Sequence, residues 1–480
     1  MTLQTKTITS LFWAFIQQFS VQLISFCITI GLARILMPAE FGLIAMLTIL
    51  VGIGSTLLDS GLASSLIRST DLTERDFSTV FFFNLGGSII IYWICYFLAP
   101  LISRLYHQPL LISIIRVYTL DFIINAFFSV QNARLVKDMN FKAQMMIQIP
   151  AVLIGGLLGI FLAFHGYGVW SLVWLALAQS FLSTVMHWFY SGWVPSLVFD
   201  KQCFKRHFGF GYKMTLSGLL DILYRNIYVV IIGSYYSVTQ LGFYNRAESF
   251  SQLPVNNISM VIHRVTYPMF SEISDDDEKL KRVYRRIMQQ VIFWVAPILI
   301  IMIILAEPLF TFLLTDKWLP AVPYFQILCL AGIMYPLNAY NLNVLKVKGR
   351  SDLVLRLETI KKFICLIGIF CATFFGIYGL LYFQLIFSVV AYYINSTYSS
   401  TLIGYPVREQ FLDLWPIFAA AMIGGVITYV IDNLIVVPLS LGNLGRIITS
   451  GFIYCVVYLC TGLLFKLIPI NDFKILILKK

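Results

Sequence analysis

Apolar runs of roughly 20 residues recur along almost the whole chain, and they limit what it can fold into more than any other feature. A helix of that length crosses the hydrocarbon core of a bilayer. Of the 480 residues, 59% are apolar and only 12% are charged. So few charges cannot cover a water-soluble surface. The sequence therefore predicts an all-α integral membrane protein with no soluble domain of its own.

We predict about fourteen transmembrane helices, because short polar clusters separate apolar runs of sufficient length. The polar segment 271–290 is expected to form a charged, amphipathic helix outside the membrane, with acidic residues at its start and basic residues at its end. The predicted spans begin near Leu11, Phe41, Val80, Leu110, Gln144, Val169, Met214, Glu248, Gln290, Val322, Phe363, Leu380, Leu414 and Arg446.

Lysine and arginine are unevenly distributed over the connections between these spans. Of 34 such residues, 27 lie in the two termini and in the connections after even-numbered spans. The connections after odd-numbered spans hold five, which are Arg34, Arg104, Arg246, Lys317 and Arg446. Because basic loops are retained in the cytoplasm, we expect both termini on the cytoplasmic side of a bacterial inner membrane. The same rule accounts for the formal charge of +11, so we expect no nucleic-acid partner.

Two stretches that lie two hundred residues apart resemble each other. Residues 35–43 lead from span 1 to span 2, and residues 235–243 lead from span 7 to span 8 in the same direction. A parallel repeat is typical of transporters that bind a solute between two lobes near the bilayer midplane, although chance similarity of apolar segments is a competing explanation. We expect an N-terminal lobe (1–190), a cytoplasmic linker (191–213), a C-terminal lobe (214–400) and two further spans with a tail (401–480), with a central cavity between two six-helix lobes.

Five charged residues fall inside predicted spans, where a charge needs a partner or a water-filled cavity. Asp221 and Arg225 are four residues apart on one helix, so they form either a structural pair or part of a solute site. Arg116 and Asp121 are five residues apart and cannot pair easily within one helix, which favours a functional role. Asp59 lies late in span 2, near its cytoplasmic end.

Polar residues also follow one another at helical spacing in four predicted spans. A single stripe of this kind usually makes hydrogen bonds between helices, whereas four stripes spread over both lobes favour a hydrated cavity. The stripes comprise Gln18, Gln22, Ser25 and Thr29 in span 1; Asp121, Asn125, Ser129 and Asn132 in span 4; Asn338 and Asn341 in span 10; and Tyr392, Asn395 and Ser399 in span 12.

Motifs for enzymatic chemistry are missing from the sequence. It contains no Walker A motif, no nucleophile elbow and no zinc-protease motif. The eight cysteines and five histidines have no metal-ligand spacing. We therefore expect no catalytic residues, no metal and no bound cofactor, and we leave open a coupling to a H⁺ or Na⁺ gradient.

Particular stretches of this sequence resemble a known family. Residues 37–46 and 59–67 resemble the first hairpin of bacterial polysaccharide exporters, specifically the Wzx-like, colanic-acid-exporter branch of the MATE-like MOP superfamily. Residues 224–226, 232–236, 241–247 and the Tyr267-Pro268 pair agree with the second lobe of that family. The resemblance covers most of the chain, to about span 12.

The resemblance implies export of an oligosaccharide that is linked to a polyprenyl pyrophosphate, from the cytoplasmic to the outer leaflet. Arg225 and Arg116 are then candidates to bind the pyrophosphate, because guanidinium groups bind phosphates bidentately. Membrane lipids and other polysaccharide-assembly proteins are candidate partners. Many relatives carry an acidic residue at the position of Tyr228, so any ion-coupling role of that residue is in doubt here.

Two other functions remain open from the sequence. A cation-coupled small-molecule or drug antiporter of MATE-like architecture would need intramembrane acids, and Asp59, Asp121 and Asp221 could serve. The other possible function is that of a membrane polysaccharide polymerase or acyltransferase. Such polymerases usually carry a large outward loop, and every predicted outward loop here is short.

Overall fold

The computed structural model describes residues 3–59, 62–69, 72–470 and 472, and every regular element in these ranges is helical. The chain divides into two compact units, Met1–Gly242 and Phe243–Lys480. The helices of the first unit are α1 (Leu3–Ile35), α2 (Pro38–Asp59), α3 (Leu62–Arg68), α4 (Glu74–Leu105), α5 (Leu111–Tyr118), α6 (Leu120–Lys137), α7 (Phe141–Phe164), α8 (Val169–Ser191), α9 (Lys201–Arg225), α10 (Ile227–Tyr235) and the first turn of α11 (Val238–Glu272).

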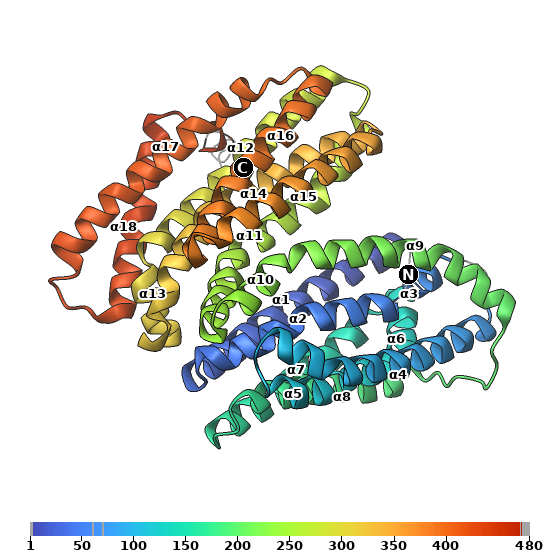
Figure 1. Cartoon of the computed structure of the whole chain (residues 1–480). Helices are drawn as coiled ribbons and strands as arrows, with labels where there is room; N and C mark the ends of the chain where they lie inside the picture. Colours follow the sequence, from blue (N-terminus) through green and yellow to red (C-terminus); the bar gives the residue numbers. More distant parts are fainter. Residues whose placement is uncertain (1–2, 60–61, 70–71, 471, 473–480) are drawn as a thin grey trace. The chain divides into compact units, whose positions relative to one another are not determined.

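The second unit contains the rest of α11 and all later helices (Figure 1). These are α12 (Asp277–Ile304), α13 (Ala306–Leu314), the 3₁₀ helix η1 (Asp316–Ala321), α14 (Val322–Val347), α15 (Ser351–Thr373), α16 (Gly376–Ile403), α17 (Val407–Ile431), the π-helical turn η2 (Asp432–Val436) and α18 (Gly442–Leu464).

The helical membrane architecture predicted from the sequence is confirmed. Eleven helical segments of the described residues are long and apolar enough to cross a bilayer. The other three predicted spans fall on α9 with α10, on α11 and on α15, which are not among these eleven. The total of fourteen spans is consistent with these helices and stays a prediction.

Two predicted boundaries are wrong. Segment 271–290 is not a separate amphipathic helix, because its basic part is the first half of α12, which continues into a span. The Asp276 carboxylate caps α12 by accepting a hydrogen bond from the Lys279 amide (2.9 Å). Span 8 was expected to begin near Glu248, but α11 begins ten residues earlier, at Val238. Polar residues in the first turns of α11 interrupt the apolar run, so the sequence pattern places the start of this span too late.

The first unit is built from helices that pack side by side. α7 packs against both α1 and α8, and α6 packs against α8 and α4 (Figure 1). α9 packs against α2, α3 and α4, so the compact unit continues past the predicted linker 191–213. Compact units are defined by contacts, whereas the predicted lobes are defined by a sequence repeat. The predicted boundary between the lobes therefore stays a prediction.

The two turns that the sequence repeat aligns have matching geometry. α1 ends at Ile35 and α2 starts at Pro38, while α10 ends at Tyr235 and α11 starts at Val238. In the first turn the Met37 amide donates to Glu40 Oε2 (2.7 Å). In the second, two hundred residues later, the Ser237 amide donates to Gln240 Oε1 (3.2 Å).

Gly42 and Gly242 make a reciprocal contact between these two helix starts, and all the residues involved belong to the first unit. A β-carbon on Gly42 would overlap the carbonyl oxygen of Val238, and one on Gly242 would overlap the carbonyl oxygen of Pro38. Only glycine permits so close an approach between two backbones. The shared glycine of the repeat therefore has a packing role.

The second unit is held together by helix pairs that share polar contacts. α14 packs against α16, and α12 packs against α17. α17 and α18 form a hairpin (Figure 1), in which Arg446 makes an ion pair with the buried Asp432 (2.6 Å). Ser450 Oγ donates to the same carboxylate (2.7 Å). This pairing satisfies a charge that would otherwise be costly at a span end.

Candidate functional site

A polar cavity of about 500 Å³ lies inside the first unit, between α2, α3, α4 and α6. Three members of the predicted span 4 stripe line it, namely Asn125, Ser129 and Asn132. Asn84 of α4 faces the same space and donates to Ser129 Oγ (2.8 Å). The full lining comprises Ser55, Leu58, Ala63, Ser64, Ile67, Asn84, Phe122, Asn125, Ala126, Phe128, Ser129 and Asn132.

An apolar cavity of about 700 Å³ adjoins it, between α2, α4 and α9. Leu58 and Asn84 line both cavities, so the two spaces share a wall. Gly86 also lines the apolar cavity, and a β-carbon built on it would meet nothing within 4 Å. The remaining lining is mostly leucine, isoleucine and aromatic side chains. A polar and an apolar space side by side suit a molecule that has both kinds of surface.

Arg116 and Asp121 lie on either side of a break between α5 and α6. Thr119 interrupts the helix, and both its Oγ1 (2.8 Å) and its amide (3.0 Å) donate to the carbonyl of Ile115. The Arg116 guanidinium carbon lies 4.1 Å from the Tyr96 ring centroid, and its Nε has no hydrogen-bond partner within the described residues. Asp121 does not pair with it. Its Oδ2 accepts from Asn125 Nδ2 (2.6 Å).

Arg225 lies beside a second break, between α9 and α10. Asn226 interrupts this helix and donates from Nδ2 to the carbonyl of Ile222 (2.9 Å). Arg225 Nε is 2.9 Å from Asp221 Oδ2, so the predicted pair is present. The Arg225 side chain is nevertheless 75% exposed within the protein. Because the Arg225 guanidinium is this accessible, it can bind another anion in place of the Asp221 carboxylate.

The stripes of spans 10 and 12 contact each other within the second unit. Asn395 Nδ2 donates to Asn338 Oδ1 (2.9 Å), and Asn341 Nδ2 donates to Ser396 Oγ (3.2 Å). Tyr284 of α12 donates to Asn341 Oδ1 (2.8 Å). Asn341 and Asn395 have no exposed surface. In this unit the polar residues of the two stripes therefore form hydrogen bonds between helices.

The remaining predicted residues are less informative. In α1, Gln18 is exposed and Gln22 is partly buried. Their neighbour Gln17 donates to Gln148 of α7 (2.9 Å). Asp59 is the last residue of α2, and its side chain lies outside the described part of the structure.

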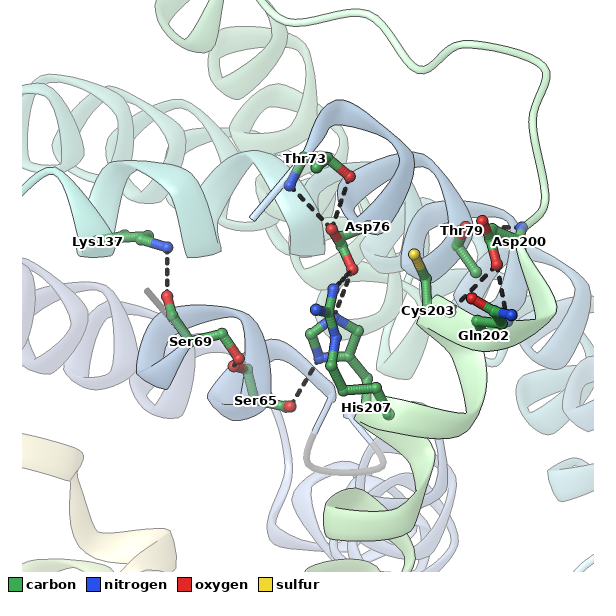
Figure 2. Close-up of polar contacts among 11 residues, drawn as sticks. Ser65, Ser69, Thr73, Asp76, Thr79, Lys137, Asp200, Gln202, Cys203 and His207 are labelled. Atoms are coloured by element: carbon green, nitrogen blue, oxygen red, sulfur yellow. Dashed lines mark hydrogen bonds and ion pairs between the residues drawn. The ribbon is translucent and has the colours of Figure 1, made fainter. Parts of the chain in front are cut away.

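A buried polar network fastens the start of α9 to the start of α4 (Figure 2). Asp76 and His207 are both fully buried, and His207 Nε2 lies 3.1 Å from Asp76 Oδ1. His207 Nδ1 is 2.7 Å from Ser65 Oγ of α3, and Arg206 pairs with the same carboxylate. The Thr73 amide donates to Asp76 Oδ2 (2.8 Å) and so caps α4. The sequence analysis missed this network, since its members are up to 142 residues apart.

Two charged residues inside α11 were also missed. Arg246, which was placed in an outward connection, is buried, with its guanidinium carbon 5.8 Å from the Trp318 ring centroid. Glu248, which was placed at a span start, lies well within the helix. The internal repeat would have placed both residues inside the helix. Shifting the start of α2 at Pro38 by two hundred residues places the start of α11 at Val238.

Two solved structures of membrane proteins share this fold. The lipid II flippase MurJ in an inward closed conformation superposes with a TM-score of 0.73, at 13% identity, over 94% of this chain and 98% of that chain. An inward-facing multidrug resistance MATE family transporter superposes with a TM-score of 0.59, at 15% identity, over 81% and 98%. The chain has the fold of a multi-pass membrane transporter.

A family model described as "Polysaccharide biosynthesis protein" matches residues 31–323, which is more than half of the chain. The protein belongs to this family. It is 24% identical over 440 residues to the lipopolysaccharide biosynthesis protein WzxC of Escherichia coli (strain K12), covering 89% of this chain and 88% of that protein. It is 28% identical over 302 residues to the teichuronic acid biosynthesis protein TuaB of Bacillus subtilis (strain 168), and this match covers 62% of each.

Proposed function

We propose that the protein moves a polyprenyl-pyrophosphate-linked oligosaccharide from the cytoplasmic to the outer leaflet of a bacterial inner membrane, for assembly of a surface polysaccharide. In this proposal both termini lie in the cytoplasm, as the distribution of basic residues predicts. The names of its relatives support a role in polysaccharide synthesis.

The adjoining cavities of the first unit carry the proposal. Their volumes of about 500 and 700 Å³ are within the range of ligand sites. A lipid-linked sugar has a polar head and a long hydrocarbon chain, so it needs a polar space joined to an apolar one. Serine and asparagine side chains in the polar cavity match sugar hydroxyls, and the leucine and aromatic lining of the other matches an isoprenoid chain.

Arg116 and Arg225 remain the candidates to hold the pyrophosphate. A guanidinium presents a planar fork that matches phosphate oxygens. Arg116 keeps its Nε unbonded within the described residues, and Arg225 is exposed next to a helix break. Helices that break at polar residues are a common way to build substrate sites inside membranes.

A multidrug resistance transporter shares this fold, so the fold alone does not separate the two functions. The family match favours the polysaccharide substrate. So does the large apolar cavity, which a lipid-linked substrate needs.

A bulky side chain in the apolar cavity tests the proposal. Gly86→Phe would fill the cavity without a clash at the β-carbon. Gly451→Phe on α18 is the matched control, because a β-carbon there also meets nothing within 4 Å. Both variants would be expressed in a host that lacks its own copy of the protein and retains the glycan-synthesis enzymes. The measurements are surface polysaccharide and lipid-linked intermediate at equal protein level.

We expect Gly86→Phe to lower surface polysaccharide and to raise the lipid-linked intermediate held in the membrane, while Gly451→Phe behaves like the wild type. Wild-type output from Gly86→Phe would refute the role of the cavity. An unchanged level of lipid-linked intermediate in cells that lack the protein altogether would refute the flippase function.

A further inference from the structure

The second unit contains a carboxyl group, that of Glu248, which has no cationic partner among the described residues and which falls at membrane depth if α11 forms the predicted span 8. Glu248 is ten residues after the start of α11, or about 15 Å along the helix axis. That is about half of the 30 Å hydrocarbon core. None of the ion pairs found among the described residues includes Glu248.

Among the described residues, Glu248 makes its hydrogen bond with an uncharged hydroxyl group. Tyr244, one turn earlier on α11, has its hydroxyl 3.3 Å from Glu248 Oε1. The same hydroxyl is 3.3 Å from Gln384 Oε1 of α16. Tyr244 is only 1% exposed, and Glu248 is partly buried. Arg246 lies two residues away on the helix, near Trp318.

Counting hydrogens shows what this arrangement requires. The Tyr244 hydroxyl has one proton and lies between two oxygen atoms that accept hydrogen bonds. If Glu248 carries a proton, it donates to the Tyr244 oxygen, and Tyr244 donates to the Gln384 carbonyl. If Glu248 is ionised, rotation of the Gln384 amide lets its nitrogen donate to Tyr244, and Tyr244 donates to the carboxylate. The three side chains can therefore stay hydrogen-bonded to one another in either protonation state, with the bonds running in opposite directions.

We propose that Glu248 is a proton-binding site, and that Tyr244 and Gln384 transmit its protonation from α11 to α16 during transport. An ionised carboxylate without a cation is expensive at membrane depth, so protonation stabilises the site when it is closed to water. A proton suits the site better than a metal ion, because hard cations gather six or more oxygen ligands. No group of three or more acidic, histidine or cysteine side chains suited to a metal occurs within the described residues.

The proposal rests on the transport function in one respect only. Proton binding belongs to the site itself, whereas its use in export requires that the protein is a flippase. The two parts therefore need separate measurements, so that failure of one is not confused with failure of the other.

Infrared spectroscopy tests proton binding without any substrate. The full chain in lipid nanodiscs would be titrated with acid and base, and the carbonyl stretch of protonated carboxyl groups followed. We expect one titrating band to be lost in Glu248→Gln and kept in Glu278→Gln, an exposed glutamate at the start of α12. Tyr244→Phe should shift the midpoint of that band, whereas the exposed Tyr393→Phe should not.

The outcomes separate the alternatives. Identical titrating bands in Glu248→Gln and the wild type would overturn the proposal. A band that responds to sodium at constant pH would overturn the choice of a proton as ligand.

Export measured in cells tests the use of the proton. We expect Glu248→Gln to reduce surface polysaccharide roughly tenfold, a coupling of the size usual between linked sites. Export by this variant should also no longer respond to collapse of the proton gradient. Wild-type export by Glu248→Gln would overturn the coupling role and leave the flippase function standing. Absence of any effect on lipid-linked intermediates, even when the protein is deleted, would refute the flippase function but not the infrared result.

Discussion

Three charged sites within the predicted spans differ in what surrounds them. Asp432 is fully paired, with Arg446 and Ser450, and is structural. Arg225 has a partner in Asp221 but remains open to its surroundings. Glu248 accepts a hydrogen bond from the Tyr244 hydroxyl and has no ion pair among the described residues. Sequence patterns identify charges, whereas the contacts decide which charges have capacity left to bind something else.

Arg225 gives a direct test of pyrophosphate binding. Arg225→Ala should abolish export at a normal protein level in the membrane. Arg225→Lys should stay about tenfold defective, roughly 1.4 kcal/mol, because an ammonium cannot reproduce the planar fork. The measurement is surface polysaccharide normalised to the amount of protein. If Arg225 only neutralises Asp221, the double variant Asp221→Ala with Arg225→Ala would regain export, which would exclude the binding role.

At the scale of elements, short local signals place the helix ends, and contacts distant in sequence hold the helices together. The Thr73 to Asp76 and Asp276 to Lys279 caps are readable from the sequence. The breaks at Thr119 and Asn226 are not, because both residues fit a continuous helix. Neither is the burial of Asp76 against a helix that starts 125 residues later, at Lys201.

The network around Asp76 should contribute to the stability of the first unit. Asp76→Asn keeps the shape of the side chain but loses the ion pair with Arg206, so we expect a loss of about 1–3 kcal/mol in the free energy of unfolding. Thermal unfolding in detergent would show it as a lower midpoint. Asp352→Asn is the control, because its pair with Arg350 is exposed and such pairs contribute little. Equal midpoints for the two variants would show that the network is not stabilising.

The glycine contact between α2 and α11 gives a second stability test. Gly42→Ala and Gly242→Ala should each cost about 1–3 kcal/mol, since the new methyl group overlaps a carbonyl oxygen. The double variant should cost less than the sum, because the first substitution already separates the helices. Thermal unfolding, with Gly451→Ala as the open-space control, measures this. Additive losses would mean that the two glycines do not share one contact.

At the scale of the whole molecule, orientation in the membrane follows from charge. We predict that Lys205 lies in the cytoplasm and Arg104 outside. Both side chains are exposed, so cysteines at these positions can react with an impermeant thiol reagent. Cells should be labelled from outside at position 104 and, only after permeabilisation, at position 205. The opposite pattern would reverse the topology.

The sequence by itself determined the membrane class, most spans and the family resemblance. These depend on the length of apolar runs and on short motifs, which the bilayer and local backbone geometry impose one segment at a time. It also marked Asn125, Ser129 and Asn132 as a polar face, and these residues line a cavity.

Only the tertiary structure decided which polar residues pair with one another. Asn338 bonds to Asn395 across 57 positions, and Tyr244 reaches Gln384 across 140. The apolar cavity is likewise formed where three helices from distant parts of the chain leave space between them. A stripe of polar residues looks the same in a sequence whether it faces a cavity or another helix. The difference depends on the packing of helices, because the neighbouring helix determines whether a polar group meets a partner or open space.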